Sequence, residues 1–246
     1  MTNEWRYNMQ RQQFETILRA RIVEAAEALN RSGVSFATFD TARSNEQFWE
    51  LTEKGGFQIK AGVTPAQGIR DIFVNGHKYA FECATAMVIV LYKGVLDSIL
   101  ESEFNRIFAD MLLYDWHYDS DLRLIQEQGS HKAVPGDILY FNNPDVSPET
   151  PEWKGENVVK LREDSFYGHG IGIHTAQGII DSLNRHRRPR ATTSAYLTNE
   201  VIYPDFAYLS QFAPEGNREE ELALSPSQEH PPRIHASIGG RQYIRA

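Results

Sequence analysis

Cys83 is the only cysteine in the 246-residue chain, and its position is compatible with either a catalytic or a structural role. It follows the polar segment 75–78 and precedes the apolar run 87–92, so we expect it to open a buried helix. The N–H groups and positive dipole end of a helix stabilise a thiolate, and they can bind the oxyanion that forms when the thiolate attacks a carbonyl. The alternative is a space-filling role, because free cysteine is among the most buried residue types.

His169 is the partner that spacing alone favours, because a strand histidine flanked by glycines can face a substrate without obstruction. A purely structural histidine on a glycine-rich strand is the alternative. No metal ligands are predicted, since the sequence has no H-E-x-x-H and the acidic stretch 115–121 lacks the glycine and terminal glutamate of a calcium loop. No glycine-rich phosphate loop occurs either. We therefore expect neither a metal nor a cofactor.

The first half of the chain, which leads up to and includes Cys83, has the sequence pattern of helices. Apolar residues at three-and-four spacing predict an amphipathic helix over 14–29. A threonine cap, with proline after it and glutamine three residues on, predicts a second helix over 64–73. The cysteine helix should follow, as far as residue 100, and a further helix is expected over 101–108.

The rest of the chain has the pattern of strands. Short apolar runs predict strands at 111–114, 138–141 and 158–161, and the segment 167–173 is expected to pair with 179–180. Helices first and strands later indicate an α+β fold. A cysteine at a helix N-terminus, packed on an antiparallel sheet that carries polar partners, is similar to the layout of papain-like and NlpC/P60-like thiol enzymes.

Composition limits the domain organisation and the compartment. With 41% hydrophobic and 24% charged residues, the composition is typical of a globular protein, and we expect a single catalytic domain over 1–212. Residues 213–246 are rich in Pro, Glu and Ser, so a polar, disordered tail is predicted there. One cysteine excludes an intramolecular disulfide, and no signal segment or membrane-length apolar run is visible. The bacterial cytoplasm is the expected compartment, with no membrane partner.

Charge limits the partners. A formal net charge of −8 weighs against nucleic-acid binding, because phosphate neutralisation needs a basic face. The four arginines within 185–190 are the exception. A solvated loop is the expected form of that segment, and a docking site for an acidic protein is the alternative.

Several segments together resemble the small protein-glutamine gamma-glutamyltransferases, or transglutaminases, of Bacillus-type spore coats. The motifs occur in family order with similar spacing and cover most of residues 17–205: Phe36-Ala37-Thr38-Phe39, Tyr79-Ala80-Phe81-Glu82-Cys83-Ala84-Thr85-Ala86, Tyr114-Asp115-Trp116-His117-Tyr118, Trp153-Lys154-Gly155-Glu156-Asn157-Val158, Gly168-His169-Gly170 and Ser194-Ala195-Tyr196-Leu197. The chain departs from the family at its ends, with a shorter N-terminus and a longer tail.

The resemblance implies an NlpC/P60-like fold and a reaction in which Cys83 attacks a glutamine carboxamide, ammonia leaves, and a lysine amine displaces the thioester. It implies Glu156 as the catalytic partner of Cys83, Glu82 as a possible substitute, and His169 nearby. It also implies independence of calcium. The family's site is a tunnel with aromatic walls, which map onto Phe36, Trp116 and Trp153; Trp153 is expected to desolvate Glu156 and so raise its basicity.

Three functions follow from these features. The first is cross-linking of spore coat proteins through Gln–Lys isopeptide bonds, by an enzyme that assembles from the mother-cell cytoplasm onto the spore coat. The second is an amidase or peptidase of NlpC/P60 type, which uses the same nucleophile but water as the acceptor. The third is a structural coat protein that keeps the fold without chemistry.

Overall fold

The computed structural model describes residues 3–214, 234–238 and 241–245. The chain divides into two units, Met1–Ala213 and Pro214–Ala246. The second unit contains an antiparallel hairpin formed by β12 (Ile234–Ile238) and β13 (Arg241–Arg245). Of the segment 213–246, which was predicted to be a disordered tail, residues 215–233, 239–240 and 246 lie outside the described residues.

The first half of the first unit is mainly helical, as predicted. Its longest helix, α1, buries residues at helical spacing along its whole second half and confirms the amphipathic pattern, although it begins earlier than predicted. A capping box at Thr64 and Gln67 starts the second helix as expected. The helices of this unit are α1 (Asn3–Arg31), α2 (Pro65–Val74), α3 (Cys83–Leu96), α4 (Glu101–Ile107), α5 (Ala176–Asn184) and α6 (Phe206–Leu209).

Helix α3 begins at Cys83, and nearly all of its other residues are buried. A helix that is apolar on every side must be covered on every side, and α1 provides much of that cover. The two helices approach closely at Gly94, where a Cβ atom would lie 2.7 Å from Cγ1 of Ile22. The helix ends at Leu96 rather than at residue 100, because the chain turns through Asp97 and Ser98 before α4.

A six-stranded antiparallel sheet makes up most of the second half. Its strand order is β10-β9-β8-β7-β11-β6. Short turns join β8 to β9 and β9 to β10, whereas residues 143–154 connect β7 to β8. The strands are β6 (Leu124–Gln128), β7 (Ile138–Asn142), β8 (Gly155–Arg162), β9 (Ser165–Gly168), β10 (Gly172–His174) and β11 (Tyr196–Pro204). The strands predicted at 138–141 and 158–161 are confirmed.

The predicted pairing of 167–173 with 179–180 is wrong. Strand β9 pairs instead with β10, and residues 179–180 belong to α5. The Thr175 side chain accepts a hydrogen bond from the Gly178 N–H and caps this helix, while Ile179 and Leu183, four residues apart, face the core. A helical period was therefore present in a segment that was too short to show it clearly.

Two smaller sheets lie before the large one. One contains β2 (Trp49–Leu51), β3 (Phe57–Ile59) and β5 (Leu112–Leu113), so that the strand predicted at 111–114 is confirmed over two residues. The other is a parallel pair of two-residue strands, β1 (Ser35–Phe36) and β4 (Ala80–Phe81). Strand β4 ends two residues before Cys83, so this pair fixes the entry to α3.

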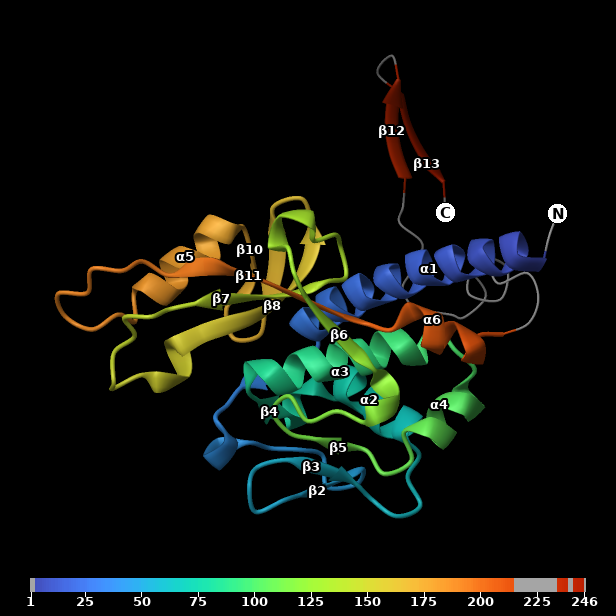
Figure 1. Cartoon of the computed structure of the whole chain (residues 1–246), viewed down its shortest axis with the longest axis horizontal. Coiled ribbons are helices and arrows are strands. Elements are labelled where there is room, and N and C mark those ends of the chain that lie inside the picture. Colours follow the sequence, from blue (N-terminus) through green and yellow to red (C-terminus); the bar gives the residue numbers. More distant parts are fainter. Residues whose placement is uncertain (1–2, 215–233, 239–240, 246) are drawn as a thin grey trace. The chain divides into compact units, whose positions relative to one another are not determined.

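The side chains form two cores, one on each face of the large sheet. The larger core joins α1, α2 and α3 to residues such as Ile138, Val159 and Tyr167, and the smaller joins α5 to Leu139, Phe141, Val158 and Phe166. Figure 1 accordingly shows α1 and α3 on one side of the strands and α5 apart from them. Because side chains alternate along a strand, neighbouring residues of β7 and β8 belong to different cores.

The arginine-rich segment 185–190 lies in the connection from α5 to β11, as predicted for a loop. Arg188 is exposed and pairs with Asp145 at 2.7 Å, and Arg187 donates a hydrogen bond to the carbonyl of Thr193. Two main-chain N–H groups, of Thr192 and Thr193, also donate to Asp145. Together these bonds hold the loop against the segment that follows β7.

Candidate active site

Cys83 lies at the wall of a cavity of about 630 Å³. The thiol is half-buried, and the cavity is bounded by the first turn of α3, the loop around Trp116 and the strands β6, β7, β8 and β11. Its wall contains Glu82, Asp115, Glu152 and Glu200 but only one lysine, Lys154. This excess of carboxylates suits a cationic group of a substrate.

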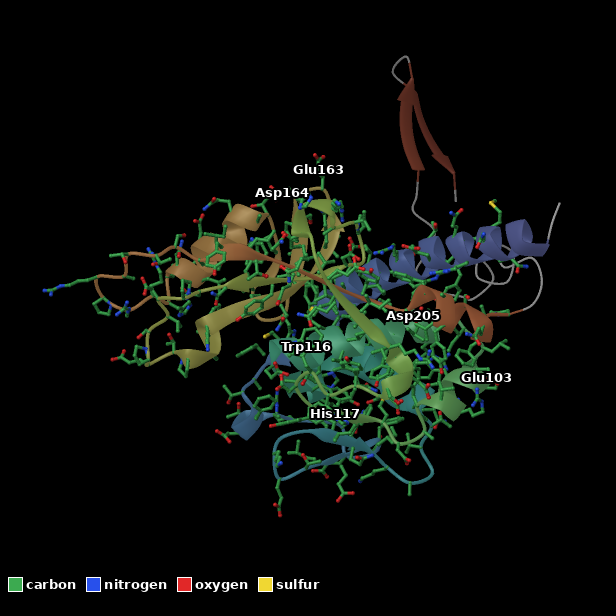
Figure 2. All side chains as sticks on the ribbon, in the orientation of Figure 1. Glu103, Trp116, His117, Glu163, Asp164 and Asp205 are labelled. Atoms are coloured by element: carbon green, nitrogen blue, oxygen red, sulfur yellow. The ribbon has the colours of Figure 1, made fainter. Side chains whose placement is uncertain are left out.

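Trp116 is the aromatic residue of the predicted tunnel that lines this cavity. It is half-buried and packs against the larger core, and Figure 2 shows it close to the start of α3, beside His117. Neither Phe36 nor Trp153 is among the lining residues. Phe36 packs beside His169, with ring centres 6.2 Å apart, and Trp153 stacks on His186 at 3.9 Å over the smaller core.

Glu82 is the N-cap residue of α3. Its two carboxylate oxygens accept hydrogen bonds from the N–H groups of Ala84 and Thr85, each at 2.6 Å. A carboxylate at this position satisfies two of the donors that a helix start leaves unpaired. The Glu82 side chain therefore occupies two of the N–H groups that were expected to bind the oxyanion, those of Ala84 and Thr85.

The thiol of Cys83 is subject to more than the dipole of its helix. Burial, followed by the negative charges of Glu156 and Glu82, raises its pKa to about 12, although contacts with Asn157 act in the opposite direction. The resting group is thus a neutral thiol rather than a thiolate. A thiol of this kind becomes a nucleophile only when a nearby base removes its proton during attack.

Glu156 is the second residue of β8 and is only 4% exposed. Its carboxyl group lies against Gly168, where a Cβ atom would be 2.9 Å from Oε1, and it accepts a hydrogen bond from the main-chain N–H of His169. Its Oε1 atom is buried and has no hydrogen-bond partner among the described residues. Burial, followed by the charge of Glu82, raises the pKa of Glu156 well above that of an ordinary glutamate.

Asn157 makes the direct contact with the thiol, and the sequence did not single it out. Its Nδ2 atom lies 3.5 Å from Sγ of Cys83. It stands opposite Tyr140 in the β7–β8 register, and both residues line the cavity. Glu156, the preceding residue of β8, does not line the cavity, and it acts on Cys83 through its charge. Only the docking of α3 on the sheet brings Asn157 to the thiol.

Both ring nitrogens of His169 are engaged in hydrogen bonds. Nε2 lies 3.1 Å from the carbonyl oxygen of Phe81 and 3.3 Å from that of Ser35, so it must carry the proton, because a carbonyl only accepts. Nδ1 then accepts from the hydroxyl of Tyr167 at 3.1 Å. Burial lowers the pKa of His169 to about 4. The histidine joins β9 to β1 and β4, and its ring has no nitrogen left for the Cys83 thiol.

Among the described residues, no group of three or more His, Cys, Asp or Glu side chains is arranged to hold a metal ion. In that same part of the chain, no helix is long and apolar enough to cross a membrane.

Comparison with known proteins agrees with this arrangement of a cysteine on a helix against an antiparallel sheet. The family model described as protein-glutamine gamma-glutamyltransferase matches residues 2–213. A protein of that name from Bacillus pumilus (strain SAFR-032) is 50% identical over 198 residues, which cover 80% of each chain. Another from Bacillus mycoides (strain KBAB4) is 46% identical over 226 residues, covering 92% of this chain and 81% of the relative.

A solved structure is similar over the same region. It is described as a transglutaminase from Geobacillus stearothermophilus without C-terminal extension, and it superposes with a TM-score of 0.81 at 54% identity, covering 84% of this chain and 99% of that one. The fold and the site thus define an enzyme of the acyltransferase class. The chain belongs to the protein-glutamine gamma-glutamyltransferase family, which confirms the resemblance seen in the motifs.

Proposed function

We propose that the protein forms isopeptide cross-links by transferring the acyl group of a protein glutamine from Cys83 to a lysine amine, with release of ammonia. The observation that supports this proposal is the environment of the Cys83 thiol. Cys83 opens onto a cavity, touches the amide of Asn157, and lies within the electrostatic reach of a buried glutamate that has a free oxygen.

In the first half of the reaction, Sγ of Cys83 attacks the carboxamide carbon while its proton passes to Glu156. The proton then goes to the departing nitrogen, so that the carboxamide NH₂ leaves as ammonia and a thioester remains. In the second half, the lysine nitrogen attacks the thioester, loses a proton to Glu156, and that proton returns to sulfur. No other reactant is needed for this balance.

Glu156 is a better candidate than His169 for the proton acceptor. An ordinary glutamate is a weak base toward a thiol, but the raised pKa of Glu156 narrows that gap. The two nitrogens of the His169 imidazole already form hydrogen bonds with two carbonyl oxygens and a hydroxyl group. Glu82 is committed to the helix amides, so we assign it to capping rather than to proton transfer.

The other features of the protein are proposed from the family resemblance. These are an NlpC/P60-like fold, a catalytic domain that ends near residue 212, no need for calcium or a cofactor, and protein partners rather than nucleic acid or membranes. We also propose spore coat proteins as substrates and the sporulating mother cell as the site of action. The relatives found in Bacillus support that setting.

The test is incubation of the protein with a substrate that exposes both glutamine and lysine. We expect a ladder of high-mass products that survives boiling in detergent and reductant, with ammonia released in proportion. Cys83→Ala should be folded and inert. Release of ammonia without cross-links, with glutamate as the product at saturating amine, would assign the protein to the hydrolases. If no ammonia were released, the third function, a structural coat protein without catalytic activity, would be favoured instead.

A further inference from the structure

Attack on a carboxamide places negative charge on the carbonyl oxygen, and that charge needs a hydrogen-bond donor. The start of α3 can supply few of them. The N–H groups of Ala84 and Thr85 donate to the Glu82 carboxylate, and the N–H of Ala86 donates to the Glu82 carbonyl. Of this first turn, only the N–H of Cys83 itself is left, so a second donor for the oxyanion would come from another element of the cavity wall.

We propose that the side-chain amide of Asn157 is that donor, and so a catalytic residue. This inference rests on the proposed acyl transfer. Asn157 belongs to β8, lines the same cavity as Cys83, and holds Nδ2 3.5 Å from Sγ. When sulfur bonds to the carboxamide carbon, the oxygen of that carbon lies next to sulfur, within reach of a donor in this position.

The resting contact fits such a role. The thiol sulfur is a weak hydrogen-bond acceptor, so the amide loses little when it turns from Sγ to the oxyanion. As sulfur attacks, the C=O π electrons move onto oxygen and Nδ2–H binds it. When the oxyanion collapses, the double bond re-forms, the C–N bond breaks, and ammonia leaves with the proton held by Glu156.

The charge of Glu82 makes a donor for the oxyanion important. Glu82 lies close enough to Cys83 to raise the pKa of the thiol, so an oxyanion on the substrate would form near a negative charge. The side chain of Asn157 is uncharged and carries two N–H donors. An aspartate at the same position would add a negative charge and remove both donors.

The experiment compares two reactions of the same thiol. Ammonia release from a glutamine peptide in a single turnover passes through an oxyanion, whereas alkylation of Cys83 by iodoacetamide does not. In Asn157→Ala we expect ammonia release to slow by about 10²- to 10³-fold, the range for one lost oxyanion donor, and alkylation to slow much less. Asn142→Ala is the matched control, because the Asn142 amide donates to the Tyr196 hydroxyl and does not line the cavity.

Equal slowing of both reactions would overturn the proposal and leave Asn157 as a support for the thiol. An unchanged rate of ammonia release would overturn it as well. If Asn157→Ala does not fold, Asn157→Asp can replace it in the experiment, because aspartate has nearly the same size as asparagine. Ammonia release at the unmodified rate by Asn157→Asp would also exclude the donor role. Failure of the proposed function itself would look different, since the unmodified protein would then be alkylated at Cys83 but release no ammonia from glutamine.

Discussion

The start of α3 and the start of β8 each contain a glutamate whose charge acts on Cys83. The two carboxylates differ in their hydrogen bonding. At α3, both oxygens of Glu82 accept hydrogen bonds from main-chain N–H groups. At β8, Glu156 is buried and keeps one oxygen without a partner among the described residues. A satisfied carboxylate stabilises a helix, whereas a buried one with a free oxygen is poorly stabilised as an anion and is ready to take a proton.

The largest effect is expected when the unsatisfied carboxylate is removed. Glu156→Gln should lower the rate of cross-linking by about 10²- to 10⁴-fold, the usual range for loss of a general base. The measurement is the initial rate of amine incorporation. Glu163→Gln is a matched control, because Glu163 is exposed at the turn from β8 to β9, where Figure 2 shows it well away from Trp116.

The same variant should also be more stable than the unmodified protein at neutral pH. Because the pKa of Glu156 is raised on folding, there is a pH window in which the folded protein keeps a proton that the unfolded chain releases, and above that window Glu156 is the buried carboxylate that can act as a base. Stability is therefore lost as pH rises above the pKa of an ordinary glutamate and through the raised one. Glu156→Gln removes this loss, so its melting temperature should exceed that of the unmodified protein by more at pH 8 than at pH 4. A variant that is less stable at both pH values would contradict the unsatisfied state of this carboxylate.

A smaller loss of activity is expected for His169→Asn, since the ring positions strands and does not meet the thiol. Its effect should appear in stability. The pKa of His169 is lowered to about 4, so stability is present above the ordinary pKa of histidine, near 6.5, and is lost as pH falls from there toward 4. Over that window the loss attributable to this group is about 3 kcal/mol.

Urea unfolding of the unmodified protein and of His169→Asn between pH 7 and pH 4 would measure this difference. The variant should be less stable at pH 7 and should show less of the acid-dependent fall. If His169→Asn lost more activity than Glu156→Gln while remaining folded, a Cys83–His169 pair would replace the assignment made here.

Glu82→Gln is expected to change the pH dependence more than the maximal rate. The charge of Glu82 raises the pKa of Glu156, so its removal should move the acidic limb of the rate profile to lower pH. Loss of one cap hydrogen bond should also cost about 1 kcal/mol of stability. A profile that did not move, together with a loss as large as that of Glu156→Gln, would make Glu82 the proton acceptor.

The smallest effect is expected from chelation. Activity should be the same with and without EDTA, measured as amine incorporation after dialysis. Loss of activity that added calcium restores would reveal a site that the described residues do not show.

The helix side of this comparison was largely predictable from the sequence, and the sheet side was not. The capping box before α2 and the apolar run after Cys83 are local signals, so they predicted their helices directly. The contact between Asn157 and the thiol depends on how β8 pairs with β7 and on how α3 packs on these two strands. Both are interactions between segments that are far apart in the sequence. The motif resemblance pointed to Glu156 as the partner of Cys83, but the burial of this carboxylate and its unpaired oxygen could be seen only in the fold.

Long-range contacts also act on the thiol in ways that a prediction from its helix alone does not include. The dipole of α3 acts on Cys83, but so do two carboxylates, one of them contributed by a strand far along the chain. Trp153 shows the same limit, since its stacking on His186 depends on the loop after α5. Sequence spacing indicates which residues can react but not which charges surround them.

Cys83 and Asn157 are 74 positions apart and come from the two halves of the first unit. During synthesis the thiol therefore leaves the ribosome well before either Glu156 or Asn157 has been added to the chain. Until β8 pairs with β7 and docks on α3, the cysteine has neither a base nor the amide beside it. An enzyme whose products are irreversible bonds between proteins is thus inactive while it is itself unfolded, when its own glutamines and lysines are most accessible.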